Sequence, residues 1–201
     1  MPPKYPKTPK DWRNFKAVFT KDQLLIGGWQ VMQSWEDHLM DVLAYEVTRN
    51  KGNILEIGFG MGISANKILS YGCSSYTAIE AHPKVAEYGR KWAKKQKIPV
   101  TILEGFWEDV VPNLVKENKK YDGILFDTYP MHEKERNKNH YPFIPHASSL
   151  LKDKGIFTYY SDETVNFRKE HLKLILENFN KVKLLKVNTL RPPKDCEYWQ
   201  E

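Results

Sequence analysis

The chain has 201 residues, of which 41% are hydrophobic and 28% charged, and its length predicts one globular domain with a formal net charge of +6. No apolar run approaches the roughly 20 residues of a membrane span, and the chain starts with proline and lysine, so we expect no membrane span and no signal peptide. Its two cysteines, Cys73 and Cys196, lack metal-ligand spacing, so we expect no disulfide framework, no metal site and a cytoplasmic location.

The N-terminal part predicts an arm followed by a long helix. Residues 1–20 are rich in proline and lysine and predict an extended N-terminal arm, with a single domain over residues 21–201. From residue 29 to residue 49 apolar side chains recur at helical spacing, so we expect a helix that Gly52 stops.

Strands then alternate with helices. We predict helices at residues 63–69, 84–97, 144–151 and 166–179 and strands at residues 53–58, 76–80, 100–104, 121–127 and 155–160. This alternation favours right-handed crossovers and a mainly parallel sheet.

The end of the chain departs from that alternation. Residues 182–189 and 197–199 predict two strands, and the short link between them permits only antiparallel pairing. We therefore expect an α/β, doubly wound, Rossmann-like fold with a mainly parallel seven-stranded sheet. A C-terminal antiparallel hairpin that closes such a sheet is typical of class I methyltransferases.

A glycine-rich turn follows the first of these parallel strands. Residues 56–62 read Glu-Ile-Gly-Phe-Gly-Met-Gly, and glycines there let a ligand approach the backbone. Glu80 ends the next strand about 20 residues later, where a carboxylate can accept hydrogen bonds from ribose hydroxyls. Both features suit NAD or S-adenosylmethionine. Ser64 and Ala65 in place of a third glycine, together with the hairpin, favour S-adenosylmethionine.

The fourth strand ends in Asp-Thr-Tyr-Pro at residues 127–130. Ligands of doubly wound sheets bind beyond the carboxyl ends of the strands, so Asp127 is expected to face the methyl group to be transferred. The turn also resembles, imperfectly, the Asp/Asn-Pro-Pro-Tyr loop of amino-group methyltransferases.

With these motifs in place, the chain resembles the guanidinoacetate N-methyltransferase family. The resembling segments are residues 31–36, 55–61, 105–110, 121–130 and 192–198, in the family's order and at similar separations. The resemblance implies an S-adenosylmethionine-dependent enzyme in which Glu36 and Asp127 hold the guanidino group of a small substrate. It places Thr128, Tyr129, Glu163 and Thr164 at that substrate as well. The implied cofactor contacts are Trp12, Met32, Met40, Glu56, Gly58, Gly60, Met61, Gly62, Ile63, Ser64, Glu80, Ala81, His82, Phe106, Trp107 and Asp127.

The chemistry of a guanidinium calls for such a pair of carboxylates. Its nitrogens are poor nucleophiles, because the group is planar, cationic and has a pKa above about 12. Two carboxylates can bind it by paired hydrogen bonds and align one nitrogen with the methyl donor. That nitrogen must lose a proton as the bond forms. We expect Asp127 to accept the proton and Glu36 to orient and neutralise the substrate.

Several alternatives stay open. Asp162 and Glu163 stand where the resembled family binds a substrate carboxylate; acids that point inward would instead suit a substrate with an amine, such as arginine or agmatine. With such a substrate, the methyl acceptor is an arginine side chain, free or in a protein.

A nucleic-acid amino group as the methyl acceptor is disfavoured because the lysines are spread out. A binding module without catalysis is the non-enzymatic reading. A monomer or a homodimer fits equally.

Overall fold

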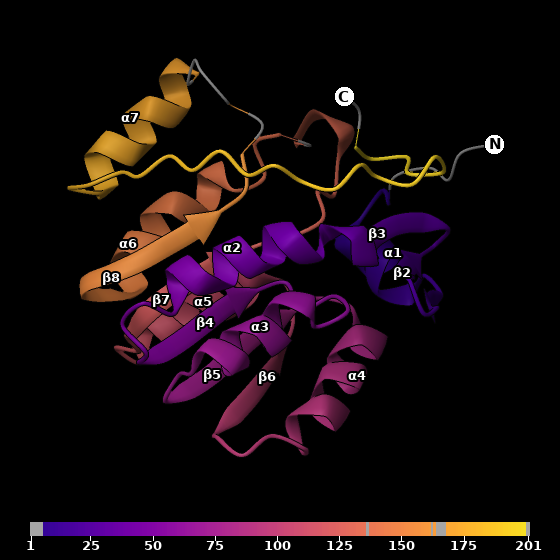
Figure 1. Ribbon diagram of the computed structural model, residues 1–201, viewed down its shortest axis with the longest axis horizontal. Helices are drawn as coiled ribbons and strands as arrows, with labels where there is room; N and C mark the ends of the chain where they lie inside the picture. The colour runs from indigo at the N-terminus through magenta and orange to yellow at the C-terminus, as the bar shows by residue number, and fades with distance from the viewer. Residues whose placement is uncertain (1–5, 136, 162, 164–167, 200–201) are drawn as a thin grey trace.

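The computed structural model describes residues 6–135, 137–161, 163 and 168–199, which form two separate sheets (Figure 1). The larger sheet is parallel, with strand order β6-β5-β4-β7-β8. Its strands are β4 (Asn53–Ile57), β5 (Ser75–Glu80), β6 (Val100–Glu104), β7 (Tyr121–Phe126) and β8 (Leu151–Tyr159). The strand order reverses between β4 and β7, which is where a doubly wound sheet opens a crevice for ligands.

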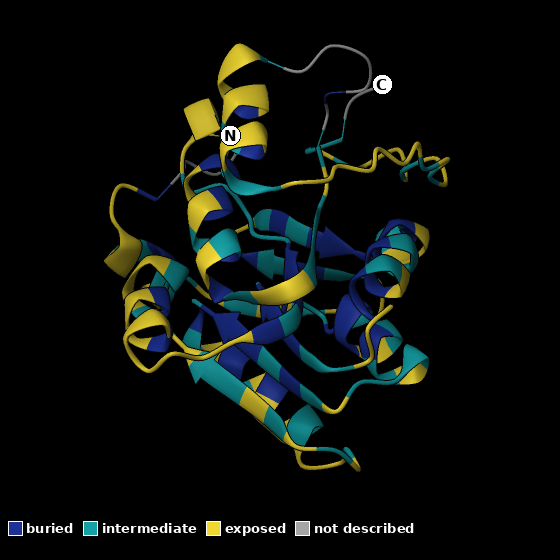
Figure 2. Ribbon diagram, turned by 90° about the vertical axis from the view of Figure 1, so that its left-hand side faces the viewer, coloured by how far each residue is buried: buried dark blue, intermediate teal, exposed yellow. Residues whose placement is uncertain are grey.

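Helices cover both faces of this sheet. One face carries α2 (Asp37–Val47), α3 (Ile63–Tyr71) and α4 (Pro83–Ala93), and the other carries α5 (Trp107–Lys116), α6 (Ile144–Leu150) and α7 (Lys169–Asn178). Residues of β4 alternate between the two cores, as strand geometry requires: Ile54 packs with the α2–α3 side, and Leu55 packs with the α5–α6 side. Figure 2 shows the buried residues gathered on the strands and on the inner faces of these helices.

The smaller sheet is antiparallel and lies near the N-terminus. Its strands β1 (Ala17–Phe19), β2 (Gln23–Ile26) and β3 (Trp29–Gln33) are in sequence order. Helix α1 (Pro9–Asn14) precedes it, and the 3-10 turn η1 (Ser34–Glu36) joins it to α2; further turns are η2 (Glu133–Glu135) and η3 (Tyr141–Phe143). The small sheet therefore delivers Glu36 to the amino end of α2.

The single seven-stranded sheet predicted from the sequence is wrong, because the described residues form a parallel sheet of five strands and a separate antiparallel sheet of three N-terminal strands that the sequence had not predicted. The predicted C-terminal hairpin is also wrong, since residues 182–189 and 197–199 form no strand. The C-terminal segment instead runs beside α2 to the small sheet (Figure 1). Lys183 pairs with Glu46 of α2 at 2.7 Å, and the Glu197 N–H donates to Gln30 Oε1 at 2.9 Å. Within the described residues, the C-terminal segment is thus held by side chains of α2 and β3 and not by backbone pairing with a neighbouring strand.

Two further local predictions need correction. The N-terminal arm is not extended throughout, because residues 9–14 are helical and residues 17–19 are a strand. Proline fits the first turn of a helix, and Thr8 caps α1 by a reciprocal pair of hydrogen bonds with Asp11. The predicted helix over residues 29–49 is β3 up to Gln33 and helical only after it. The residues that carried the helical spacing all follow β3, namely Trp35, Leu39, Met40, Leu43 and Val47.

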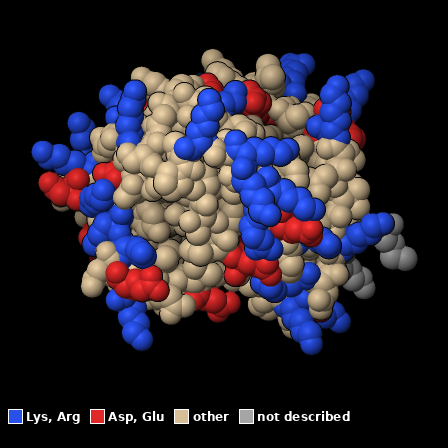
Figure 3. Space-filling view, turned by 90° about the horizontal axis from the view of Figure 1, so that it is seen from below, with Lys and Arg blue, Asp and Glu red and all other residues tan. Residues whose placement is uncertain are grey.

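The outer surface carries basic and acidic side chains side by side. Figure 3 shows basic side chains spread over one face with acidic ones between them. On α4, for instance, Lys84 and Lys91 both pair with Glu87. None of the helices in the described part of the chain is both long and apolar enough to cross a membrane.

Candidate active site

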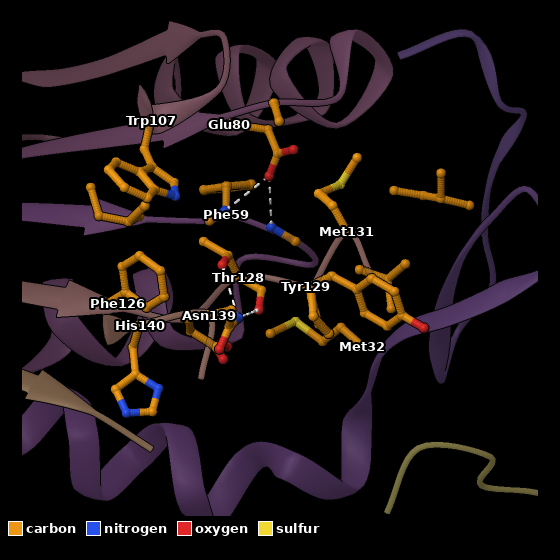
Figure 4. A pocket seen from close by; sticks show the side chains of 18 of the residues that line it. Met32, Phe59, Glu80, Trp107, Phe126, Thr128, Tyr129, Met131, Asn139 and His140 are labelled. Atoms are coloured by element: carbon orange, nitrogen blue, oxygen red, sulfur yellow. Dashed lines mark hydrogen bonds between the residues drawn. The ribbon is translucent and has the colours of Figure 1, made fainter. Parts of the chain in front are cut away.

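A cavity of about 900 Å³ lies at the carboxyl ends of β4, β5, β6 and β7 (Figure 4). The small sheet and the C-terminal segment complete its wall. Figure 4 shows Trp107, Phe126 and His140 on one side and Tyr129, Met32 and Met131 on the other. The lining includes these residues predicted from the sequence: Trp12, Met32, Glu36, Met40, Gly58, Gly60, Glu80, Ala81, Phe106, Trp107, Asp127, Thr128 and Tyr129. The fold thus brings together residues that are up to 117 positions apart, from Trp12 to Tyr129.

The backbones of two predicted residues touch at the bottom of this cavity. The Asp127 N–H donates to the Ile57 carbonyl at 2.9 Å, which extends the pairing of β7 with β4 by one residue. Gly58 follows with φ of +90°, and a Cβ there would lie 2.0 Å from the Asp127 carbonyl oxygen. Only glycine fits this crossing, because a side chain would push Asp127 away. Gly58 therefore sets the position of the Asp127 carboxylate.

Glu80 is buried at the end of β5 and holds the glycine-rich turn. One carboxylate oxygen accepts the N–H groups of Phe59 at 3.0 Å and Gly60 at 3.3 Å, and the other accepts the His82 N–H at 2.8 Å. Burial raises the pKa of Glu80, and these three donors oppose that rise. The carboxylate lines the cavity beside Phe59 (Figure 4). Glu80 therefore links the end of β5 to the glycine-rich turn.

Glu56 lies behind the wall of the cavity rather than in it. Its carboxyl group is bonded to the hydroxyls of Ser64 and Tyr76, and burial raises its pKa to about 8. Glu56 therefore links β4 to α3 and β5 through buried hydrogen bonds. The described lining also lacks other predicted cofactor contacts, namely Met61, Gly62, Ile63, Ser64 and His82.

Glu36 and Asp127 open onto the same cavity from η1 and from the end of β7. Glu36 Oε1 accepts the Gln33 N–H at 2.7 Å and the Tyr198 hydroxyl at 2.5 Å. Burial raises the pKa of Glu36 to about 7, and the charge of Asp127 adds to the rise. Burial raises the pKa of Asp127 to about 6. Two buried carboxylates that repel each other create a site for a cation, because a cation restores the ionised form of both.

Glu163 is held in a polar cluster one layer behind His140, a residue of the cavity wall. Burial opposes its ionisation, but hydrogen bonds from Tyr141, from Arg168 and from His171 lower the pKa of Glu163 to about 2. Among the described lining residues Glu163 is absent, although His140 lies 5.0 Å from His171 between ring centroids. Thr164 and Asp162 lie outside the described residues.

The N-terminal arm packs against the cavity wall. Trp12 of α1 stacks on Tyr129 with ring centroids 5.6 Å apart and planes at 11°. Arg13 donates to the Ala81 carbonyl at 3.2 Å and pairs with Glu104 at 2.8 Å. At the opposite wall Trp107 begins α5 and packs edge-on against Phe143, with ring centroids 5.3 Å apart.

Sequence reasoning assigned no role to several residues that line the cavity. Gln30, Asn139, His140, Tyr160, Tyr198 and Trp199 all contribute to the wall. The resemblance had included the segment with Tyr198, but only the pairing with Glu36 reveals its place in the site. Nothing in the sequence pointed to Asn139 as a site residue. Its side-chain amide donates to the Thr128 carbonyl at 2.6 Å and so stabilises the turn after β7 (Figure 4).

The charge of the lining is strongly asymmetric. Its described acidic residues are Glu36, Glu80, Glu108, Asp127, Glu135 and Glu197, against one lysine, Lys138, which is paired with Glu170. No arginine belongs to the described lining, although the protein as a whole is basic. The described residues also include no cluster of three metal-ligating side chains. The cavity is therefore suited to organic cations.

Comparisons with known proteins agree with this geometry. The family model described as guanidinoacetate N-methyltransferase matches residues 6–201. Protein arginine N-methyltransferase 2 of Yarrowia lipolytica is 30% identical over 160 residues, which is 75% of this chain and 33% of that protein. The protein of the same name from Candida glabrata is 31% identical, covering 76% and 38%. The chain thus spans about a third of the length of these curated relatives.

The fold itself is shared with solved methyltransferase structures. A putative S-adenosylmethionine-dependent methyltransferase from Streptococcus mutans superposes with a TM-score of 0.57 and 12% identity, covering 89% of this chain and 51% of that one. The sheet order, the acidic cavity and the family match over nearly the whole chain agree with one another. The chain belongs to the guanidinoacetate N-methyltransferase family, whose members are class I methyltransferases that use S-adenosylmethionine as cofactor.

Proposed function

We propose that the chain transfers a methyl group from S-adenosylmethionine to a nitrogen of a guanidino group. The observation that carries this proposal is the pair of carboxylates, Glu36 and Asp127, on the wall of one cavity with Glu80. Burial raises the pKa of Glu36 and the charge of Asp127 raises it further, so a planar cation between the two carboxylates stabilises the ionised form of both.

The residues present fit the cofactor. Glu80 offers an ionisable carboxylate at the end of β5, next to backbone that is free of side chains at Gly58 and Gly60. Met32, Met40 and Trp12 supply apolar wall to the same cavity, with Met32 against the glycine-rich turn. When bound, S-adenosylmethionine supplies an electrophilic methyl group on a sulfonium.

The residues of this chain then do three things. Glu36 and Asp127 bind the guanidinium and restrict it to one plane. The apolar wall excludes water, which strengthens both interactions. Asp127 accepts the proton that the attacking nitrogen loses, because it directly follows β7 and its backbone lies against Gly58 of the glycine-rich turn.

Two acceptors remain, and separate observations favour each. The family match over residues 6–201 supports guanidinoacetate or a related small guanidino compound. The acidic lining supports an arginine side chain, because a lone substrate carboxylate would meet six acids and one lysine that is already paired. An arginine residue in a protein has no free carboxylate, and free arginine carries an ammonium group beside its own. The names of the curated relatives point the same way.

A direct assay separates these acceptors. Labelled S-adenosylmethionine is offered with guanidinoacetate, arginine, agmatine, an arginine-containing peptide or RNA, and methyl transfer is counted. We expect transfer to a guanidino compound and none to RNA. Transfer to RNA alone, or to no guanidino compound at all, would refute the proposal.

Replacing Glu80 with alanine is expected to raise the dissociation constant of S-adenosylhomocysteine between about tenfold and a hundredfold, because hydrogen bonds to a charged group are lost. Isothermal calorimetry measures this change, with a thermal melt to verify the fold. The control is Glu117→Ala, which removes an exposed carboxylate at the C-cap of α5, at the opposite end of the helix from Trp107 in the cavity wall. Equal affinities in both variants would exclude Glu80 from the cofactor site.

A further inference from the structure

The end of the chain forms one edge of the acceptor half of the cavity. We call residues 195–199 the C-terminal strap. The side chain of Gln30 on β3 binds it twice: its amide nitrogen donates to the Asp195 carbonyl at 2.8 Å, and its oxygen accepts the Glu197 N–H at 2.9 Å. Gln30 is buried, and both bonds are partly buried. The strap is therefore docked at a defined register on the small sheet.

Aromatic packing fixes the strap at a second point. Tyr198 stacks on Trp35 of η1 with ring centroids 6.2 Å apart, and Trp199 meets the same indole edge-on at 5.3 Å. Trp35 immediately precedes Glu36 in the chain. The ring that carries the Tyr198 hydroxyl is thus held against the turn that carries the Glu36 carboxylate.

The contact with Glu36 is directional. The Tyr198 hydroxyl and the Gln33 N–H both donate to Oε1 of Glu36, at 2.5 Å and 2.7 Å. Within the described part of the chain Oε2 accepts no hydrogen bond, so one oxygen is anchored and the other is left for a ligand. Burial, together with the charge of Glu36 and the hydrogen bond to it, keeps the pKa of Tyr198 far above its usual value, so its hydroxyl remains a donor.

We infer that Tyr198 is a positioning residue of the acceptor site, which orients Glu36 through its hydroxyl so that Oε2 meets the guanidino group. This inference rests on the proposed function for its kinetic consequence, but the effect on Glu36 itself does not depend on any substrate. The groups that face Glu36 are Asp127 from β7, Tyr198 from the strap and the Gln33 backbone from β3. The first opposes its ionisation, and the other two favour it.

The test compares Tyr198→Phe with the wild-type protein. Phenylalanine keeps the ring on Trp35 and removes only the hydroxyl. The Glu36 carboxyl is followed by carbon-13 NMR during a pH titration in the absence of substrate. We expect its pKa to rise above the wild-type value by about one unit, since a stabilising donor to the charged form is lost.

Kinetics give the second readout. For the variant we expect the KM of the guanidino acceptor to rise about tenfold near neutral pH, the acidic limb of kcat/KM to move to higher pH, and the affinity for S-adenosylhomocysteine to stay the same. The matched control is Tyr45→Phe, since the Tyr45 side chain is about half exposed on α2, and it should change none of these values. A structural role alone would lower the melting temperature without moving the acidic limb.

A second variant tests the strap without touching Tyr198. Gln30→Ala removes both backbone contacts and should raise the Glu36 pKa and the acceptor KM in the same direction as Tyr198→Phe. An unchanged Glu36 titration in Tyr198→Phe would overturn the inference. If no guanidino compound is methylated by the wild-type protein, the proposed function fails instead, and the titration still decides the role of Tyr198.

Discussion

Asp127→Asn is expected to lower kcat for methylation of the guanidino acceptor by about a thousandfold. Asparagine fills the same space but carries no charge and accepts no proton, so the attacking nitrogen keeps its hydrogen and the guanidinium loses one of its two carboxylates. Affinity for S-adenosylhomocysteine should remain within about threefold, because Glu80 and the glycine-rich turn are untouched. Single-turnover transfer assays and calorimetry measure the two quantities.

The control for Asp127→Asn is Asp122→Asn on the same strand. Asp122 lies at the other end of β7, where it accepts the Asn53 N–H at 2.7 Å and pairs with Lys152 at 2.7 Å. Its replacement should cost stability but leave kcat within about twofold. If the Asp127→Asn variant kept the wild-type kcat, Asp127 would be excluded as the proton acceptor, and the fold assignment would be unaffected.

Gly58→Ala is expected to lower the free energy of unfolding by about 3 to 5 kcal/mol and to abolish methyl transfer. Two costs add: a side chain at φ of +90°, and a Cβ 2.0 Å from the Asp127 carbonyl oxygen, which has no room to withdraw. Relief of the clash must move the end of β7 and with it the Asp127 carboxylate. Chemical denaturation and the transfer assay check the two parts.

The chain offers a control for the backbone cost alone. Gly72, at the end of α3, has φ of +91°, but a Cβ there would meet nothing within 4 Å. Gly72→Ala should therefore lower stability by only about 1 to 2 kcal/mol and leave transfer unchanged. If Gly58→Ala and Gly72→Ala lowered the free energy of unfolding equally, the close contact between Gly58 and Asp127 would not contribute to the effect.

The residues at the ends of strands were the most predictable part of the site. Glu80 and Asp127 each follow a short apolar run, and parallel strands bring their carboxyl ends to one edge of the sheet. Of the residues whose roles were assigned only by resemblance, some lie at the cavity and others do not. Glu36 opens onto the cavity, whereas Ser64 turns to Glu56 and Glu163 turns to Arg168 and His171. Their proposed ligand contacts remain predictions.

The amino-acid sequence by itself determined the parallel strands β4 to β7, the glycine-rich turn and the two strand-end carboxylates, because each depends on neighbours within a few residues. Tertiary structure alone decided that residues 182–199 leave the sheet, that the small sheet stands apart, and that Tyr198 meets Glu36 across 162 positions. The reason is physical. Local pattern predicts that a segment can be a strand or a helix, whereas its partner is chosen by which packing surface and which unpaired donors lie within reach after the rest of the chain has folded.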